Sequence, residues 1–256
     1  MFKAIKERLK QGYRTIDFPR SLPVLPDRFR GLPTIDSSKC PDGCQACAEA
    51  CPTDAITING DVKLDLGRCL FCTDCQQACP EDAIAYSTDH RLAVRSRDDL
   101  VINGKSGLQL AQAIEEKSRR IFGRSLQLRQ VCAGGCSACE ADINVLGTVI
   151  FDLGRFGIHL VASPRHADGL IVTGPLTQNM KLALKKVYAA TPAPKFVIAV
   201  GACAISGGPF AGHDEQNDGC DRIVPVDMYI PGCPPHPLTI LDGILRLLGR
   251  IDEKKS

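Results

Sequence analysis

Two runs of cysteines stand close together in the first third of the chain. The second run, Cys69-x2-Cys72-x2-Cys75-x3-Cys79-Pro80, has the spacing with which bacterial proteins hold [4Fe–4S] clusters through thiolates. The first run, Cys40-x3-Cys44-x2-Cys47-x3-Cys51-Pro52, has one more residue between its first two cysteines. These residue types at this spacing predict single-electron chemistry on two clusters.

The chain has 14 cysteines in 256 residues, and a disulfide scaffold is the alternative use for them. Such scaffolds belong to short secreted chains. The segment after Met1 has no apolar core of a signal peptide, and the longest apolar stretch, around 196–200, is too short to span a bilayer. We therefore expect a reducing compartment and no transmembrane segment. Tryptophan is absent and aromatic residues make up 5%, which argues against a nucleic-acid partner.

Charge is unevenly distributed along the chain. Residues 1–39 contain nine Lys and Arg against four acidic residues, whereas residues 40–86 contain eight acidic residues against Lys63 and Arg68. An acidic surface of this kind can steer a basic redox partner by electrostatic attraction. It can equally serve only to keep a small domain in solution, and both interpretations stay open.

The N-terminal residues predict a basic amphipathic helix over 2–10. Phe2, Ile5 and Leu9 fall on one face, and lysines and an arginine lie elsewhere. Such a helix can dock in a groove of a partner protein or lie on an anionic membrane. Four prolines between 12 and 38 suppress helix and predict an extended arm, which we expect to need the surface of another protein to be ordered.

Residues 39–86 contain an internal repeat. Each half has a cysteine run, then Cys-Pro-x-Asp-Ala-Ile, and then a short β segment, at 55–58 and at 83–86. The repeat predicts a small pseudo-twofold α+β domain of the ferredoxin-like class, with a core made mostly of its clusters because so short a chain buries few side chains. Between 88 and 125 the pattern predicts a linker with a strand at 90–94 and a helix at 108–122.

From residue 126 onward, short apolar runs alternate with helical patterns. We expect strands at 126–131, 158–162, 170–172, 196–200 and 226–230, and helices at 141–156, 178–189 and 237–248. Continuous β-branched runs between helices predict an α/β domain with a parallel sheet buried on both faces. The pattern is typical of a doubly wound, flavodoxin-like sheet, in which sites form beyond the carboxyl ends of the strands.

The remaining cysteines lie in those loops. Cys136 and Cys139 follow the first strand, Cys203 follows the fourth and Cys233 follows the fifth. Four thiolates at one sheet edge can hold a third cluster or a structural zinc ion. The two clusters upstream favour iron and sulfur, because an electron that enters them needs a further acceptor. Cys132 and Cys220 are left over, and we expect both to be small buried apolar side chains.

Several catalytic motifs are absent from the sequence. After the clusters are assigned, no pair of Cys-x2-Cys motifs remains to bind nickel, and neither a GxGxxG fingerprint nor a phosphate-binding loop with its lysine is present. The glycine-rich stretch 201–208 contains Cys203 and is interpreted as backbone wrapped around a cluster. We expect no catalytic residue in this chain, and no hydrogen splitting, nicotinamide binding or nucleotide hydrolysis by the chain alone.

The loop Val131–Glu140, VCAGGCSACE, resembles the proximal-cluster loop of [NiFe]-hydrogenase small subunits. The resemblance continues in SPRHAD (163–168), VTGP (172–175), GACAISGG (201–208) and IPGCPPHP (230–237). The same pattern is found in the cluster-bearing subunit of respiratory complex I. The N-terminal part resembles the two-cluster ferredoxin subunit of these assemblies, including the segment Phe29-Arg30-Gly31. The chain is therefore similar to a fusion of two adjacent subunits of a membrane-bound, energy-converting (group 4) hydrogenase of the formate hydrogenlyase type.

One detail separates the two branches of this resemblance. The complex I subunits use two adjacent cysteines, whereas Cys136-x2-Cys139 is the hydrogenase form. Gly135 departs from the family, since many small subunits carry Glu before the first ligand. The alternatives are a complex I-like quinone oxidoreductase subunit and, in another class, a non-catalytic redox sensor or assembly protein.

The resemblance implies three [4Fe–4S] clusters. In two-cluster ferredoxins the fourth cysteine of each run binds the other cluster. The expected ligand sets are Cys40, Cys44, Cys47 and Cys79; Cys69, Cys72, Cys75 and Cys51; and Cys136, Cys139, Cys203 and Cys233.

The resemblance also implies partners and a location. The implied partners are a NiFe large subunit, membrane-anchor subunits and an electron donor, which would be a formate dehydrogenase, a CO dehydrogenase or a ferredoxin. The expected hetero-oligomer lies peripherally on the cytoplasmic face of the inner membrane.

Four residues near the expected third cluster have two interpretations each. Arg165, His166 and His236 either raise the cluster potential or make an ion pair or capping contact, for example with Asp168. Glu140 either takes part in proton movement or is a carboxylate at a helix start. The expected division of the chain is 1–38 helix and arm, 39–87 ferredoxin domain, 88–125 linker, 126–250 third-cluster domain, and 251–256 tail.

Overall fold

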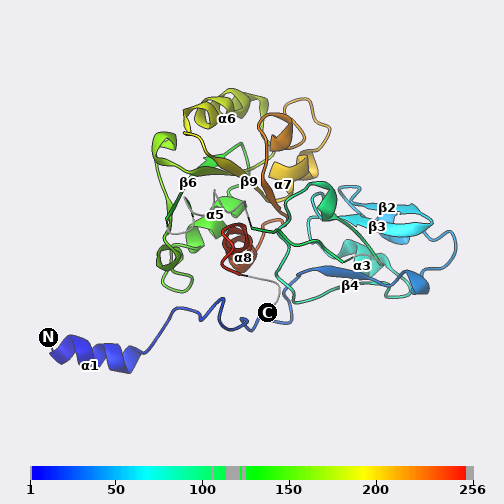
Figure 1. The fold of residues 1–256 in the computed structure, drawn as a ribbon. Coiled ribbons are helices and arrows are strands. Elements are labelled where there is room, and N and C mark those ends of the chain that lie inside the picture. The colour runs from blue at the N-terminus through cyan, green and yellow to red at the C-terminus, as the bar shows by residue number, and fades with distance from the viewer. Residues whose placement is uncertain (1, 105–106, 114–121, 123–124, 252–256) are drawn as a thin grey trace.

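The computed structural model describes residues 2–104, 107–113, 122 and 125–251. The predicted N-terminal helix is present as α1 (Phe2–Gln11), every residue of which is exposed. Figure 1 shows α1 extending away from the rest of the molecule. Within the described ranges, no helix is long and apolar enough to cross a membrane.

The arm that follows α1 packs on its own chain, so the expectation that it needs another protein is wrong. Thr15 Oγ1 donates to Val149 O at 2.7 Å, and Ile16 N donates to Ile150 O at 2.9 Å. Phe18 is only 4% exposed, because its ring enters the core on one face of the large sheet. Burial of an aromatic side chain of this size orders the arm.

The arm then enters the cysteine-rich region. This region contains β1 (Pro33–Ile35), η1 (Ser37–Lys39), α2 (Ala46–Glu49), β2 (Ile56–Asn59), β3 (Asp61–Asp65), α3 (Asp74–Ala78), β4 (Ile84–Tyr86), η2 (Asp98–Leu100) and β5 (Val101–Asn103). The two predicted β segments form β2 and β4, but they lie in different sheets. β2 belongs to the antiparallel sheet β2-β3-β5, whereas β4 pairs with β1.

The linker differs from its prediction. Residues 90–94 do not form a strand, and Val94 makes an isolated bridge with Tyr229 through two backbone hydrogen bonds of 3.0 and 2.9 Å. The predicted helix at 108–122 lies mostly outside the described residues, and residues 107–113, which are described, are not helical.

The α/β part contains a five-stranded parallel sheet, as predicted. Its strands are β6 (Leu126–Cys132), β7 (Ile158–Leu160), β8 (Gly169–Thr173), β9 (Phe196–Val200) and β10 (Met228–Ile230), in the order β10-β9-β8-β6-β7. Its helices are α5 (Ala138–Val145), α6 (Gln178–Ala190), α7 (Ala202–Ser206) and α8 (Pro237–Leu247), with short 3-10 turns η3 (Leu153–Phe156), η4 (Pro164–His166), η5 (Gly208–Phe210) and η6 (Cys220–Arg222). β8 and β9 are buried along their whole length, which confirms a sheet covered on both faces (Figure 1).

Helix α5 ends earlier than predicted. The pattern indicated a helix to residue 156, but the helix stops at Val145 and the chain turns through Gly147 before η3. Asp152 has a φ of +49°, a left-handed conformation that a continuous helix excludes. The apolar spacing therefore comes from two short elements that bury Ile143, Leu146 and Leu153 in one core.

The two parts of the chain share one hydrophobic core. Leu64 and Leu66 of the cysteine-rich region belong to the same buried cluster as Val131 and Leu170 of the sheet and Ile205 of α7. We expected the core of the cysteine-rich region to consist mostly of clusters. The region also buries apolar side chains against the α/β part of the chain, so this expectation is only part of the answer. Burial of this kind makes the two parts one packed unit rather than two tethered domains.

Candidate iron–sulfur centres

The first cysteine set comes from both runs. Cys40, Cys44, Cys47 and Cys79 all line a cavity of about 390 Å³ between α2 and the start of β4. Burial raises the pKa of the Cys47 thiol, and the charges of Cys79 and Cys75 raise it further. The extra residue of the first run lies in a turn closed by Cys44 N donating to Pro41 O at 3.2 Å. Gly43 has a φ of +75° there, which glycine adopts without strain.

The second set gathers around Tyr86 of β4. The Tyr86 hydroxyl lies 3.7 Å from Cys69 Sγ and 3.6 Å from Cys75 Sγ. Burial raises the pKa of Cys69 to about 12, and the nearby Cys75 and Cys51 thiols contribute to the rise. Cys72 and Cys75 also experience the charge of Cys51, so the last cysteine of the first run lies with the second run.

The repeated Cys-Pro-x-Asp-Ala motif has a structural reason. Asp54 and Asp82 have left-handed φ angles of +49° and +48°, which aspartate tolerates better than most residues. The turn aims the next backbone N–H at the cysteine sulfur. Ala55 N donates to Cys51 Sγ at 3.2 Å, and Ala83 N donates to Cys79 Sγ at 3.3 Å. Hydrogen bonds to the sulfurs are one of the means by which proteins set cluster potentials.

The third set assembles at the carboxyl edge of the parallel sheet. Cys136 and Cys139 follow β6, Cys203 lies in α7 directly after β9, and Cys233 follows β10. Burial raises the pKa of Cys139, and Glu140, Cys203, Cys233 and Cys136 add negative charge around it. Burial also raises the pKa of Cys203 to about 11, followed by the effects of Cys233 and Cys136.

The backbone fits closely around this third set. A Cβ on Gly201, whose φ is +90°, would lie 2.6 Å from Cys139 Sγ, and a Cβ on Gly208 would lie 2.9 Å from Cys203 Sγ. These distances are too short for real contacts, so the glycines let the chain approach the thiols. The close approach supports the interpretation of 201–208 as backbone wrapped around the site.

The donor set suits iron–sulfur clusters. Each set contains thiols whose burial disfavours the thiolate form, among them Cys47, Cys69 and Cys203, and bound iron cations would compensate for the grouped negative charge. Across the ranges that the structure describes, no three His, Cys, Asp or Glu side chains are arranged to hold a single metal ion. In a [4Fe–4S] cluster each thiolate binds its own iron, so the four sulfurs need not converge on one ion.

The two remaining cysteines behave differently from each other. Cys220 is fully buried, as expected, and burial raises its pKa to about 12. Cys132 is exposed, so the expectation that it is buried is wrong. It is the last residue of β6, and its side chain lies beside Glu140.

Glu140 lies in the first turn of α5, next to the third set. Partial burial opposes its ionisation, but hydrogen bonds with Cys132 and Thr173 outweigh this effect and hold the pKa of Glu140 below its usual value. Thr173 Oγ1 donates to Glu140 Oε1. The carboxylate at a helix start is therefore present in the structure, while a role in proton movement stays a prediction.

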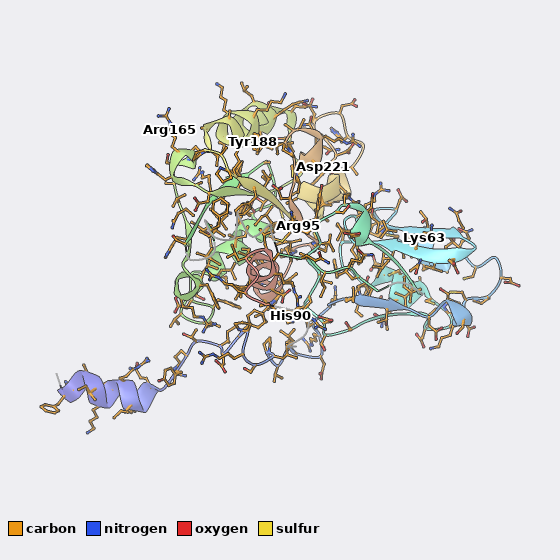
Figure 2. All side chains as sticks on the ribbon, in the orientation of Figure 1. Lys63, His90, Arg95, Arg165, Tyr188 and Asp221 are labelled. Atoms are coloured by element: carbon orange, nitrogen blue, oxygen red, sulfur yellow. The ribbon has the colours of Figure 1, made fainter. Side chains whose placement is uncertain are left out.

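Two of the predicted basic tuning residues, Arg165 and His166, lie away from the third set. Arg165 and His166 are exposed in η4, which leads into Gly169 at the start of β8, the opposite sheet edge from the cysteines. Figure 2 shows Arg165 near α6, at the outer end of the molecule. Asp168 accepts a hydrogen bond from Gln127 N, not from these side chains. His236 caps α8 by accepting from Leu238 N at 3.1 Å, which supports its capping interpretation.

The sequence patterns gave no role to Tyr86, and they named Arg30 only as part of the segment Phe29-Arg30-Gly31. Tyr86 occupies the place in the second half of the repeat that Ile58 holds in the first, and a polar aromatic residue in a short apolar strand was the available signal. Arg30 Nη1 donates to Phe71 O at 2.9 Å and to Cys72 O at 3.3 Å, inside the second cysteine run.

Comparisons with known families match both parts of the chain. Residues 136–247 match the family described as NADH ubiquinone oxidoreductase, 20 Kd subunit, and residues 39–83 match the 4Fe-4S dicluster domain. A probable membrane-bound hydrogenase subunit, mbhJ, from Pyrococcus furiosus is 45% identical over 132 residues, which cover 52% of this chain and 79% of that protein.

Other relatives come from both predicted branches. Formate hydrogenlyase subunit 7 from Escherichia coli is 45% identical over 51% of this chain and 51% of that protein. An NADH-quinone oxidoreductase subunit from Heliobacterium modesticaldum is 43% identical over 46% of this chain and 69% of that protein. A chain of the membrane-bound sulfane sulfur reductase, an archaeal respiratory membrane complex, is 33% identical, with a TM-score of 0.47 over 53% of this chain and 75% of that chain.

The fold, the cysteine sets and these matches define an iron–sulfur subunit of an oxidoreductase, without a complete active site of its own. The chain belongs to the family of the 20 kDa subunit of NADH ubiquinone oxidoreductase, preceded by a 4Fe-4S dicluster domain. The predicted resemblance is thereby confirmed.

Proposed function

We propose that this chain is the electron-transfer subunit of a membrane-associated hydrogenase complex. Three [4Fe–4S] clusters bound by the twelve cysteines of the three sets would accept and release single electrons. The protein positions them and sets their surroundings. The observation that carries the proposal is the continuous succession of the three sets through one packed unit.

The charges of neighbouring thiols support this order. Cys75 of the second set acts on the pKa of Cys47 in the first, and Cys72 of the second set acts on the pKa of Cys233 in the third, in each case after the larger effect of burial. We infer from these effects that the second set lies between the other two. A path through the chain would begin at the first set and end at the third.

The proposed partner at the third set is a NiFe large subunit. The spacing Cys136-x2-Cys139 supports this choice, as do relatives named as membrane-bound hydrogenase and formate hydrogenlyase subunits. Membrane-anchor subunits and a donor, either a formate dehydrogenase, a CO dehydrogenase or a ferredoxin, complete the proposed hetero-oligomer. It would lie peripherally on the cytoplasmic face of the inner membrane.

We also propose the finer fold and domain divisions. Counted along the sheet domain, the strand order is 2-1-3-4-5, which supports a flavodoxin-like assignment. The proposed division keeps 39–87 as the ferredoxin domain and 126–250 as the third-cluster domain, with 1–38 as helix and arm, 88–125 as the linker and 251–256 as the tail.

A second candidate is a complex I-like quinone oxidoreductase subunit. It is favoured by relatives named as NADH-quinone oxidoreductase subunits, which match at similar identity. A redox sensor or assembly protein is a third hypothesis. The shared core and the burial of Cys69 and Cys75 in the second set favour an electron-transfer subunit with a fixed place in a complex over this hypothesis.

The test is anaerobic co-purification of the chain with its native partners. We expect about twelve irons per chain, nickel in the complex and hydrogen formation with a low-potential donor. Cys139→Ser should abolish hydrogen formation while partly sparing reduction of the first two clusters. A nickel-free complex that reduces quinone at normal rates supports the second candidate, and the iron of only two clusters with stoichiometric zinc removes the third cluster.

A further inference from the structure

The segment Phe29–Gly31, which the sequence singled out without a function, runs between the second and third cysteine sets. Arg30 donates from one guanidinium nitrogen to the carbonyls of Phe71 and Cys72, at 2.9 and 3.3 Å. These carbonyls belong to the loop that contains Cys72. One end of the segment is therefore attached to the second set.

The same segment also contacts the loop of the third set. The ring of Phe29 packs edge-on against the ring of His236, with centroids 5.3 Å apart. His236 caps α8 and follows Cys233 by three residues. Arg30, Phe29, Phe71, Cys233 and His236 line a common cavity of about 390 Å³, so both loops face the segment.

The backbone of the segment is held in place from behind. Gly31 N donates to Ser87 O at 2.7 Å, and Leu32 N donates to Asp89 O at 2.8 Å. A Cβ on Gly31 would lie 2.1 Å from Asp89 O, so this position accepts only glycine without displacement of the chain. The side chains of Phe29 and Arg30 therefore project from a fixed base.

The two loops that the segment joins also lie close together. Phe71, which directly precedes Cys72, lines the same cavity as Cys233. Arg30 is bonded to the carbonyl of Cys72 itself. The contacts of the segment therefore lie between the loop of the second set and the loop of the third.

We propose that Phe29–Gly31 is a positioning strap that fixes the separation of the second and third sets. This inference rests on the proposed function, in which both sets hold clusters and exchange electrons. Two packed parts of one chain move relative to each other unless their contacts prevent it. Arg30 holds the Cys72 loop by a charge-assisted bond, and Phe29 holds the Cys233 loop by ring packing. Arg30 is a positioning residue and touches no reacting atom.

The experiment compares the full chain, purified anaerobically with its clusters, with the variants Arg30→Ala and Arg30→Lys. Arg28→Ala is the matched control, because Arg28 lines the same cavity without a hydrogen bond to any described residue. The first readout is hydrogen exchange of the backbone amides of 69–73. The second is the magnetic interaction between the second and third clusters in the fully reduced protein, measured by electron paramagnetic resonance.

We expect Arg30→Ala to speed exchange of the 69–73 amides roughly tenfold, since a charge-assisted hydrogen bond is lost. The magnetic interaction should weaken, with the iron content unchanged. Arg30→Lys should restore part of both properties, and Arg28→Ala should match the wild type. Phe29→Ala should loosen the amides near 232–236 instead.

If Arg30→Ala changes neither hydrogen exchange of the 69–73 amides nor the magnetic interaction between the clusters, the proposal that Phe29–Gly31 is a positioning strap is wrong. Equal effects of Arg28→Ala and Arg30→Ala also overturn it, because the effect would then come from charge in the cavity. If the wild-type chain itself shows only two clusters, the proposed function fails, and this outcome is visible before any variant is made.

Discussion

At the residue scale, grouped buried thiols carry the proposed chemistry. Burial raises the pKa of Cys47, Cys69 and Cys203, so these thiols stay protonated in the absence of a cation. Bound iron reverses the preference by favouring the thiolate. The same burial acts on Cys220, which has no other thiol around it and so has a packing role.

The two cysteines outside the sets should be dispensable for cluster binding. Cys220→Ser and Cys132→Ser should each retain about twelve irons and the wild-type cluster spectra, because neither thiol lies within a set. Cys220→Ser should lower the melting temperature, since it buries a hydroxyl in an apolar site, whereas Cys132 is exposed and its change should not. Cys203→Ser is the comparison that should lose or convert one cluster. Loss of iron in Cys132→Ser contradicts the assignment of the loop.

A buried histidine should give the chain a pH-dependent stability. His90 is 5% exposed, and its Nε2 atom has no hydrogen-bond partner in the part of the chain that the structure describes. Burial lowers the pKa of His90 below its usual 6.5, although Asp242 and Asp89 favour the charged form against Arg91 and Arg246. The unfolded chain therefore takes up a proton near 6.5, where the folded chain does not.

Stability should consequently fall as pH drops below 6.5, until the folded-state pKa of His90 is reached. The largest slope that one proton allows is about 1.4 kcal/mol per pH unit. Melting temperatures of the wild type and His90→Gln, compared between about pH 7.5 and 5.5, check this. The difference between the two proteins should grow toward low pH in favour of the variant. A constant difference rules out His90 as the source.

At the element scale, α1 is the one described helix whose residues are all exposed. Its apolar side chains Phe2 and Leu9 are 85% and 79% exposed, and Figure 1 shows no packing of the helix on the rest of the chain. The arm behind it is anchored through Thr15, Ile16 and Phe18. A docking role therefore belongs to α1 alone and not to the whole segment 1–38.

Deletion of residues 2–11 should leave iron content and melting temperature unchanged, because no buried contact is removed. Co-purification with membrane-anchored partners should weaken. Two triple variants then distinguish docking in a partner groove from binding to an anionic membrane. The apolar variant changes Phe2, Ile5 and Leu9 to Ser, and the charge variant changes Lys3, Lys6 and Lys10 to Gln.

If α1 docks in a groove of a partner protein, the apolar variant should lose co-purification with the partners, and salt should have little effect on it. An anionic membrane predicts loss in both variants, with binding to phosphatidylserine vesicles that falls as salt rises. Normal assembly of the deletion variant contradicts docking by α1.

At the scale of the whole molecule, the two parts of the chain are joined from two sides. On one side, Ser206 Oγ of α7 donates to Gly67 O, which follows β3, at 2.9 Å. On the other side, Phe29–Gly31 spans the loops of the second and third sets. Between them lies the shared core. The two parts therefore form one packed unit, in which the labelled Lys63 of the cysteine-rich region and Arg165 beside the sheet lie on opposite sides (Figure 2).

The sequence alone determined the local features of this protein. The repeated cysteine runs with their Cys-Pro-x-Asp-Ala-Ile motif, the strand at 196–200 and the start of the helix at Gln178 could be predicted directly. Each depends on residues that are neighbours in the chain, through backbone preference, side-chain volume and the alternation of apolar residues. The parallel sheet followed for the same reason, since β-branched runs between helices bury both faces.

Only the tertiary structure decided which distant residues meet. The exposure of Cys132, the early end of α5, the arm bound to its own chain and the contact of Arg30 with the Cys72 loop all depend on how two remote segments dock. The cavity that Phe71 and Cys233 line together has the same origin. Such contacts depend on the packing of a shared core, and the free energy of that packing is a sum over side chains far apart in sequence. Local sequence patterns therefore do not predict them.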